Sequence, residues 1–292
     1  MGVDIEAARA RFPAPPVTRF APSPTGYLHL GHVVNAIYVW GVARALGGRV
    51  LLRIEDHDRI RSRPAFEAAL LEELDWLGFV ADEGREPLVR QSDTADVYSD
   101  ALARLGRQHH VYACACSRRE IGGEQYGGRC RDRNLPFAPG YGIRVALEDR
   151  EERFDDLRHG VIVQRPASQC GDLLLRDRDG QWTYQFAVVA DDIRQDVTLV
   201  IRGDDLLSST GRQVQLARML GRPAPATFLH HPLLYASPGV KLSKISRDTG
   251  IRELRHQGMT PEAVIGRAAA AAGLLDREVP VAAGGVSALF LS

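Results

Sequence analysis

The chain has 292 residues, no net formal charge, 45% hydrophobic residues and 25% charged residues. This composition excludes a disordered chain and one whose overall charge attracts nucleic acid, so an RNA partner would need a local basic face. The sequence shows no apolar run long enough to cross a bilayer and no signal-peptide core before Pro16, so we expect a cytoplasmic protein without a membrane partner.

The first part of the sequence alternates between predicted strands and helices. An apolar strand over 17–21 leads through a loop into an apolar helix over about 31–46, which Gly47-Gly48 ends. A second apolar strand, 50–54, ends at Glu55, and a helix with Pro64 in its first turn follows as far as Gly78. Because fully apolar strands are covered on both faces, this order predicts a parallel sheet between two layers of helices.

The loop before the first helix contains His29-Leu30-Gly31-His32. A helix N-terminus offers N–H donors and a positive dipole to an anion, and two imidazoles add further donors. Gly31 removes a side chain where a flat base could approach the backbone. No Gly-Lys-Ser/Thr follows, so this is not a P-loop. Alone the four residues are a weak signal, since two histidines at a helix start are more often structural.

The stretch from 105 to 182 differs from the preceding sequence in composition and pattern. It has many glycines, a short strand over 143–147 and a hairpin signal at Asp179-Gly180. We interpret it as an inserted α+β subdomain. Cys114, Cys116 and Cys130 cluster within it, whereas a tetrahedral zinc site needs four ligands. From spacing alone the fourth ligand stays open, with His109 and His110 as competitors, and Cys170 is interpreted as a core thiol.

A third apolar strand, 197–201, ends at Arg202, and a helix over about 206–220 follows it. In open α/β sheets, ligands bind beyond the carboxyl ends of the strands. Glu55 and Arg202 are therefore placed as ligand contacts. After a strand over 228–235 the chain becomes helical, with a helix start at Thr260-Pro261. The predicted domains are a catalytic domain (17–104 and 183–245), the insertion (105–182) and a helical C-terminal segment (246–292).

Lysine use is the sharpest feature of the composition. The chain has 37 basic residues, of which only Lys241 and Lys244 are lysines, and both lie in the tetrapeptide Lys-Leu-Ser-Lys. A chain that uses arginine elsewhere keeps lysine here, where a compact, mobile ammonium serves better than a planar guanidinium. The alternative is chance placement in a solvated loop.

Both motifs, in this order on an α/β pattern, resemble the two signatures of class I aminoacyl-tRNA synthetases. Segments 19–26, 52–56 and 200–206 are similar to segments of the glutamyl-tRNA synthetases, and the resemblance extends over about 17–244. Glutamyl-tRNA synthetases continue into an anticodon-binding half, which we do not find here. A short chain with a Cys-x-Cys cluster resembles the glutamyl-queuosine tRNA(Asp) synthetase family, a ligase family that attaches glutamate to the queuosine base in an anticodon.

The resemblance implies a Rossmann-like doubly wound parallel sheet, and ATP, L-glutamate and a tRNA, tRNA(Asp) bearing queuosine, as partners of a monomer. Glu55 suits the glutamate ammonium, and Arg202 and Arg19 suit its carboxylates through their fork geometry. By resemblance, Ala21, Ser23 and Tyr184 complete this pocket. The expected catalytic and ATP-binding residues are His29, His32, Lys241 and Lys244, with Gly31 near the adenine.

The resemblance also points to Tyr126 as the fourth ligand of a structural zinc ion, beside Cys114, Cys116 and Cys130. Mg²⁺ is expected with ATP, without identified protein ligands. Asp56 and Asp58 are interpreted as supporting or solvated charges. A structural ion pair is the alternative for Arg19 and Glu55. Ile245 stands where synthetases often carry a polar or basic residue, which leaves the dynamics of the lysine loop open.

Three other functions remain alternatives. One is a glutamyl-tRNA synthetase catalytic half that charges a tRNA 3′ end. Another is a small-molecule nucleotidyltransferase with the same histidine loop. A third is a non-catalytic RNA-binding relative, against which the intact histidines and lysines argue.

Overall fold

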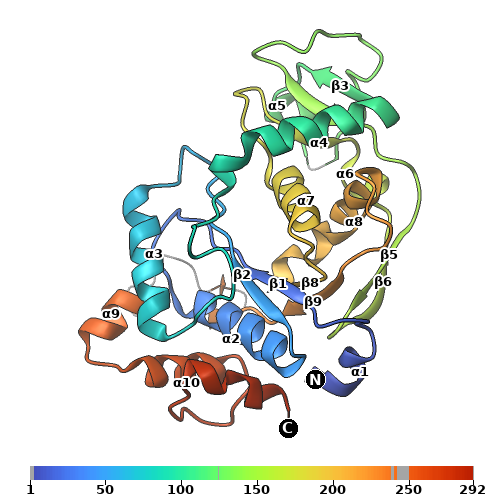
Figure 1. Ribbon diagram of the computed structural model, residues 1–292. Coiled ribbons are helices and arrows are strands. Elements are labelled where there is room, and N and C mark those ends of the chain that lie inside the picture. Colours follow the sequence, from blue (N-terminus) through green and yellow to red (C-terminus); the bar gives the residue numbers. More distant parts are fainter. Residues whose placement is uncertain (1–2, 124, 238–239, 242–249, 292) are drawn as a thin grey trace.

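The computed structural model describes residues 3–123, 125–237, 240–241 and 250–291 (Figure 1). Its centre is a parallel sheet in which β1 pairs with β2 and β8 pairs with β9. The Thr198 N–H donates to the Val17 carbonyl at 2.9 Å, which places β1 beside β8. The strands are β1 (Val17–Phe20), β2 (Arg49–Leu52), β8 (Leu199–Gly203) and β9 (Thr227–His231). The predicted parallel α/β sheet is thus confirmed, with a shorter last strand than 228–235.

Two strands that the sequence did not reveal extend this sheet. β5 (Glu152–Asp156) pairs in parallel with β9 through Asp156 and Phe228, and β6 (Gly160–Gln164) pairs with β5 in the antiparallel direction. Both strands belong to the stretch 105–182, so part of the predicted insertion continues the central sheet. The domain boundaries themselves remain a prediction.

Side chains of the central strands alternate between two hydrophobic clusters. Leu199, Ile201 and Leu229 pack with α2 (Leu30–Ala45), whereas Val200 and Phe228 pack with Val214. Val214 belongs to α8 (Thr210–Met219), which lies beside α7 (Tyr184–Arg194) on the second face. Helices therefore cover both faces, which explains why the strands are apolar throughout.

The first two long helices begin and end where the sequence predicts. His29 caps α2, and the chain leaves it through Gly47 with a φ of 71°. α3 (Pro64–Leu77) starts at Pro64 and ends at Gly78 with a φ of 82°. Positive φ favours glycine, so both glycines act as helix stops.

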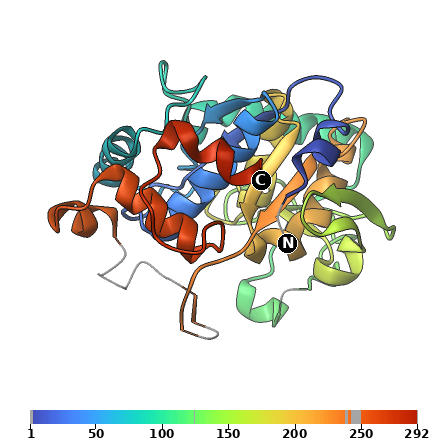
Figure 2. The ribbon, with the colours of Figure 1, turned by 90° about the horizontal axis from the view of Figure 1, so that it is seen from below.

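The C-terminal segment packs along α2, as the view from below shows (Figure 2). A Cβ atom on Gly41 would lie 2.3 Å from the Phe290 ring, so glycine lets the two segments touch. Thr260 caps the predicted helix through its Oγ1, which accepts from the Ala263 N–H. The elements are α9 (Ile251–His256), α10 (Pro261–Ala271) and the 3₁₀ helix η4 (Ala283–Phe290).

The helix predicted over 206–220 starts late. Residues Asp204–Ser209 form a 3₁₀ helix, η2, and α8 begins only at Thr210. Gln164 on β6 accounts for this, because its side chain accepts from the Gly211 N–H and donates to the Leu207 carbonyl. A contact 47 residues away in sequence thus determines where the helix begins.

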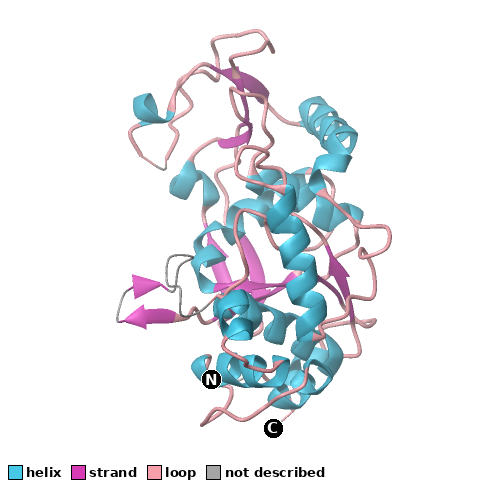
Figure 3. Cartoon of the chain, turned by 90° about the vertical axis from the view of Figure 1, so that its left-hand side faces the viewer, coloured by secondary structure: helices cyan, strands magenta, loops and turns pink. Residues whose placement is uncertain are grey.

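The remainder of the insertion lies at one end of the molecule (Figure 3). Its three strands form an antiparallel sheet in the order β3-β4-β7, and the predicted turn is present at Gly180, which has a φ of 80°. Its elements and the helix before it are α4 (Ala95–Gln108), β3 (Val111–Cys114), α5 (Arg118–Ile121), β4 (Gly142–Val145), α6 (Pro166–Cys170) and β7 (Leu173–Arg176). Other short elements are α1 (Ile5–Arg9), η1 (Gln91–Thr94), β10 (Tyr235–Ser237) and β11 (Val240–Lys241).

Among the described residues, the structure contains no helix with the length and apolar character that a membrane span requires.

Candidate active site and metal centre

A cavity of about 680 Å³ opens beyond the carboxyl ends of β1 and β8, where the sheet topology predicts a ligand. The structure brings nine of the predicted residues to its wall: Arg19, Ala21, Ser23, His29, Gly31, His32, Glu55, Tyr184 and Arg202. Lys241 belongs to β11, but its side chain lies outside the described residues, as does all of Lys244.

The two histidines of the loop are oriented by the backbone of α2. Nδ1 of His29 accepts from the Gly31 N–H at 3.0 Å, and Nδ1 of His32 accepts from the His29 N–H at 3.1 Å. A backbone N–H can only donate, so each neutral ring carries its proton on Nε2. Both imidazoles therefore act as Nε2–H donors at a helix N-terminus, which suits a phosphate.

Gly31 has a steric reason to be glycine. A Cβ atom at this position would lie 2.8 Å from Cε1 of His29, inside van der Waals contact. The glycine thus lets the His29 ring fold back over the first turn of α2. This steric reason does not involve a ligand. It is compatible with the prediction that Gly31 lies near the adenine.

A buried glutamate anchors the same loop. The Leu28 N–H donates to Oε2 of Glu73, whereas Oε1 has no hydrogen-bond partner among the residues that the structure describes. Burial raises the pKa of Glu73 to about 7, against the opposing hydrogen bond from Leu28 and the charge of Arg252. The carboxyl group is thus partly protonated near neutral pH.

We expect Glu73→Gln to stabilise the protein above pH 7. The folded state holds the Glu73 proton more tightly than the unfolded chain, so this contribution is complete below about pH 4.5 and is lost as the pH rises through about 7. Glutamine keeps the acceptor for Leu28 and cannot ionise. Urea unfolding at pH 8 should show a gain of roughly 1–3 kcal/mol, and at pH 4.5 little difference. An equal effect at both pH values would contradict the ionisation.

Arg202 is a buried cation held by neutral groups. Its guanidinium donates from Nε to His230 at 3.1 Å, from Nη1 to Gln213 at 2.6 Å and from Nη2 to Thr210 at 2.8 Å. Burial lowers the pKa of Arg202, Tyr184 opposes this, and the charge of Arg19 adds to it. A buried charge with neutral partners on a cavity wall is costly, so this site favours an anionic ligand.

A second buried pair fixes the direction of the Arg202 fork. Asp156 accepts from Nδ1 of His230 at 2.7 Å and from its backbone N–H at 3.0 Å. Burial lowers the pKa of His230, although Asp156 opposes this, so the neutral ring presents its Nε2 lone pair to the Nε–H of Arg202. This support could not be predicted from the sequence, since Asp156 lies on the unpredicted strand β5.

Arg19 and Glu55 are paired, but not with each other. Nε of Arg19 lies 3.1 Å from Asp192, and Glu55 accepts from Nη2 of Arg53 at 2.9 Å. Arg53 is completely buried and also reaches Asp192 at 2.9 Å, so it joins the two pairs into one cluster. Each side chain thus has a structural ion-pair partner, as the alternative interpretation expects, although the two do not pair with each other, and both line the cavity wall.

The neighbouring carboxylates have the supporting roles that the sequence predicts. Asp56 accepts from the Ser92 N–H at 2.8 Å, and Asp58 pairs with Arg61 at 2.5 Å. Ser23 donates to the Glu55 carbonyl at 2.7 Å and so ties the loop after β1 to the chain after β2. Burial raises the pKa of Tyr184, so its phenol stays protonated beside the pocket.

Several cavity residues were missed by the sequence analysis. His231 stacks on Tyr38 with ring centres 5.0 Å apart, and its Nε2 lies 3.2 Å from Oδ1 of Asn35. Burial lowers the pKa of His231 to about 4, so the ring is neutral. The wall beside it is largely apolar and includes Val34, Pro232, Leu233 and Leu234. In the sequence, the adjacent pair His230-His231 is the feature that could have pointed to His231.

The three clustered cysteines lie together in the insertion. Their sulfur atoms are all within 4.8 Å of one another, and Cys116 and Cys130 are 3.6 Å apart. The Tyr126 hydroxyl lies 3.3 Å from the Cys114 sulfur and 3.8 Å from that of Cys116. Ligands about 2.3 Å from a tetrahedral zinc ion are themselves about 3.8 Å apart, so these four groups fit such an ion.

The competing ligands lie elsewhere. His109 contacts the Met219 carbonyl through Nε2 at 3.2 Å, and His110 lies against Tyr112. Cys170 is buried and donates to the Pro166 carbonyl at 3.3 Å, which agrees with a core thiol. Among the described residues, the cysteine cluster is the metal-ligand group that the structure contains.

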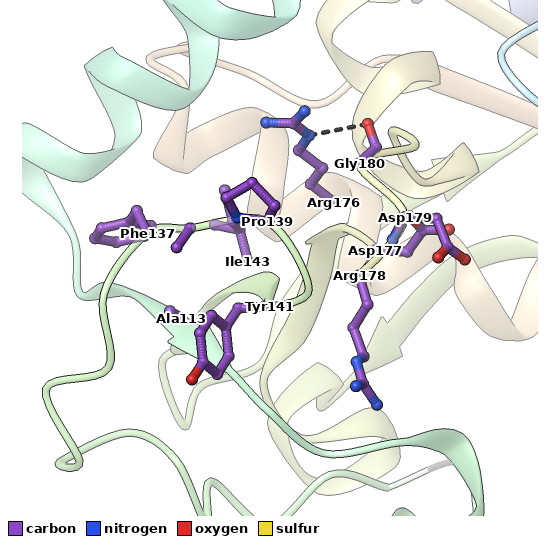
Figure 4. A pocket seen from close by; sticks show the side chains of 11 residues that line it. Ala113, Phe137, Pro139, Tyr141, Ile143, Arg176, Asp177, Arg178, Asp179 and Gly180 are labelled. Atoms are coloured by element: carbon purple, nitrogen blue, oxygen red, sulfur yellow. Dashed lines mark hydrogen bonds between the residues drawn. The ribbon is translucent and has the colours of Figure 1, made fainter.

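A smaller cavity of about 270 Å³ lies on the insertion (Figure 4). Phe137 and Tyr141 line one side, and Arg176 and Arg178 come from the other. Arg176 donates from Nε to the Gly180 carbonyl at 2.9 Å, which closes the turn that follows β7.

Comparison with known proteins agrees with this geometry. The family model described as tRNA synthetases class I (E and Q), catalytic domain, matches residues 16–134 and 138–272. A glutamyl-Q tRNA(Asp) synthetase of Symbiobacterium thermophilum is 42% identical over 289 residues, which cover 90% of this chain and 88% of that protein. Glutamate–tRNA ligase 1 of Acidithiobacillus ferrooxidans is 41% identical over 261 residues, 85% of this chain and 55% of that protein.

The fold has a counterpart among solved structures. The crystal structure of a glutamate tRNA ligase from Elizabethkingia meningosepticum, in complex with its amino acid, matches with a TM-score of 0.78 at 29% identity. The match covers 94% of this chain and 64% of that chain, so this chain spans just under two thirds of that ligase.

Proposed function

Because the chain belongs to the class I tRNA synthetases of the glutamyl and glutaminyl type, we propose that it activates L-glutamate with ATP and transfers it to queuosine in the anticodon of tRNA(Asp). The observation that carries the amino-acid specificity is Arg202, a buried guanidinium on the cavity wall with neutral protein partners. The similarity along 88% of a glutamyl-Q tRNA(Asp) synthetase supports the acceptor.

In the first step, a carboxylate oxygen of glutamate attacks the α-phosphorus of ATP, and the bond to pyrophosphate breaks. This nucleophile is already ionised at neutral pH, so the step needs positioning and cationic stabilisation rather than a base. His29 and His32 donate from Nε2 to the phosphates at the N-terminus of α2. Lys244 and Lys241 supply ammonium cations, and Mg²⁺, when bound with ATP, would neutralise part of the phosphate charge.

Glutamate presents two carboxylates and one ammonium group. Arg202 and Arg19 receive the carboxylates, and Glu55 receives the ammonium through the oxygen that Arg53 leaves unbonded. Ala21, Ser23 and Tyr184 line the same part of the cavity. The apolar wall near His231 and Leu234 suits the adenine ring.

The cysteine cluster with Tyr126 fits a structural zinc ion, which would hold the ends of the insertion loop together. We expect Cys116→Ser to abolish stoichiometric zinc binding and to lower the melting temperature by on the order of 5–10 °C. Metal analysis of the purified protein and a thermal melt measure both effects, with Cys170→Ser as the matched control. Native protein that contains no zinc would refute this site.

We also propose that the enzyme acts as a monomer in the cytoplasm, where ATP, glutamate and tRNA are available. A second acceptor, the 3′ end of a tRNA, has one specific observation in its favour. The similarity to a glutamate–tRNA ligase reaches 41% identity, nearly that to the glutamyl-Q enzyme, although it covers 55% of that ligase.

Labelled glutamate and two tRNA pools distinguish these acceptors. One pool comes from cells that make queuosine, and the other from cells that cannot. We expect label on the queuosine-containing pool alone, at a bond that survives removal of the tRNA 3′ end. Equal labelling of both pools would mean charging of the 3′ end and would overturn the queuosine acceptor.

A further inference from the structure

A smaller pocket has His57 on its wall. It has a volume of about 250 Å³, and its walls include His57, Gln91, Tyr98, Arg176 and Trp182. The centre of the His57 ring lies 6.2 Å from that of Tyr184, which lines the catalytic cavity. His57 therefore lies on the wall of the smaller pocket and near Tyr184 of the catalytic cavity, two residues after Glu55, the proposed ammonium ligand.

Hydrogen bonds determine which nitrogen of His57 carries the proton. Nδ1 lies 2.7 Å from Oε1 of Gln91, and Nε2 of Gln91 donates to Asp191 at 2.9 Å. An ionised carboxylate can only accept, so Gln91 must turn its amide nitrogen to Asp191 and its oxygen to His57. Nδ1 of His57 consequently holds the hydrogen, and Nε2 holds a lone pair.

Buried hydrogen bonds hold Gln91 and Asp191, the residues that orient His57, in place. Asp191 is completely buried and also accepts from Tyr98 at 2.7 Å and from Arg194 at 3.0 Å. Gln91 is 1% exposed. A buried network with this many satisfied bonds holds the imidazole in one orientation before any ligand binds. Within the described part of the chain, Nε2 of His57 has no hydrogen-bond partner.

The two chemical steps differ in their need for a base. The first step uses a carboxylate, whereas in the second a neutral hydroxyl attacks and must lose its proton. The pocket beside His57 suits the nucleotide that carries this hydroxyl, because its wall contains an arginine, Arg176, and an aromatic side chain, Trp182. An aromatic ring and an arginine together favour an unstacked base.

We propose that His57 is the general base of the transfer step, an inference that rests on the proposed function. The acceptor oxygen bonds to the carbonyl carbon of the glutamyl-adenylate, and the bond from that carbon to the phosphate oxygen breaks. AMP leaves with the electron pair, and the hydroxyl proton passes to Nε2 of His57 and then to water. Asp191, through Gln91, stabilises the imidazolium that forms.

The test isolates the second step. Enzyme-bound glutamyl-adenylate is formed from glutamate and ATP, pyrophosphate is removed, and single-turnover transfer to queuosine-containing tRNA is followed. His57→Ala should lower this rate by about 100-fold or more, with ATP–pyrophosphate exchange unchanged. Added imidazole should restore transfer by His57→Ala in proportion to its concentration. His57→Gln, which can accept a hydrogen bond but not a proton, should stay slow. His256→Ala, an exposed histidine, is the control.

Transfer at the wild-type rate by either His57 variant would overturn the proposal, as would the absence of any response to imidazole. Unchanged exchange in His57→Ala excludes a folding defect, and His57→Gln repeats the test with a side chain of similar reach. If the wild-type enzyme labels a tRNA 3′ end instead of queuosine, the proposed acceptor fails. The same rate comparison on that hydroxyl then tests His57 separately.

Discussion

Glutamate activation by Arg202→Gln is expected to fall by on the order of 100- to 1000-fold in kcat/KM, because charged hydrogen bonds to the bound carboxylate are lost. Within the described part of the chain, the three nitrogens of the buried guanidinium donate to neutral groups, so we expect a ligand carboxylate to supply its countercharge. Glutamine is too short and uncharged to replace it. ATP–pyrophosphate exchange with varied glutamate measures the loss.

Two variants sharpen this prediction. Arg202→Lys keeps the charge but not the fork, so it should recover only part of the activity. Arg107→Gln removes an exposed arginine of α4 and should exchange pyrophosphate normally. Thermal melts establish that each variant is folded. Exchange by Arg202→Gln at nearly the wild-type rate would remove Arg202 from glutamate recognition.

The second large effect is expected at Lys244. Lys244→Ala should lower kcat for glutamate activation by on the order of 100- to 1000-fold, with little change in glutamate affinity. The reason is that a cation on the phosphate oxygens acts on charge that develops in the transition state. Exchange kinetics and equilibrium binding of glutamate measure the two quantities separately.

Lys241→Ala provides a comparison with Lys244→Ala, since we expect Lys241 to neutralise less of the phosphate charge than Lys244 does. Arg252→Ala removes an exposed cation on α9 and is the matched control for a loss of positive charge. Equal losses of activation and of glutamate binding in Lys244→Ala would exclude a transition-state role for this lysine.

The local parts of the fold could be predicted from the sequence. The apolar strand β2, before Glu55, and the helix stops at Gly47 and Gly78 follow from hydrophobic pattern and from positive φ, which are properties of adjacent residues. The same is true of the helix start at Thr260, whose side chain bonds three residues ahead. These features need no knowledge of distant contacts.

The features that could not be predicted depend on contacts between residues that are far apart in the sequence. Arg53 is visible as a charge in an apolar strand, but its partner Asp192 is far along the chain. The delayed start of α8 depends on Gln164, and the extra strand β5 depends on its pairing with Phe228. In each case an alternating or polar pattern is compatible with several partners, so only the assembled sheet selects one.

The position of β5 limits how the catalytic domain can exchange parts with its relatives. The strand lies between the two catalytic segments in the sequence, yet its last residue, Asp156, orients His230 and through it Arg202. The stretch 105–182 is therefore not an autonomous cassette. A recombinant that acquires this stretch from another synthetase would take Asp156 from one parent and His230 from the other. The two residues that orient Arg202 would then come from different proteins. Asp156 and His230 are thus expected to change together or not at all.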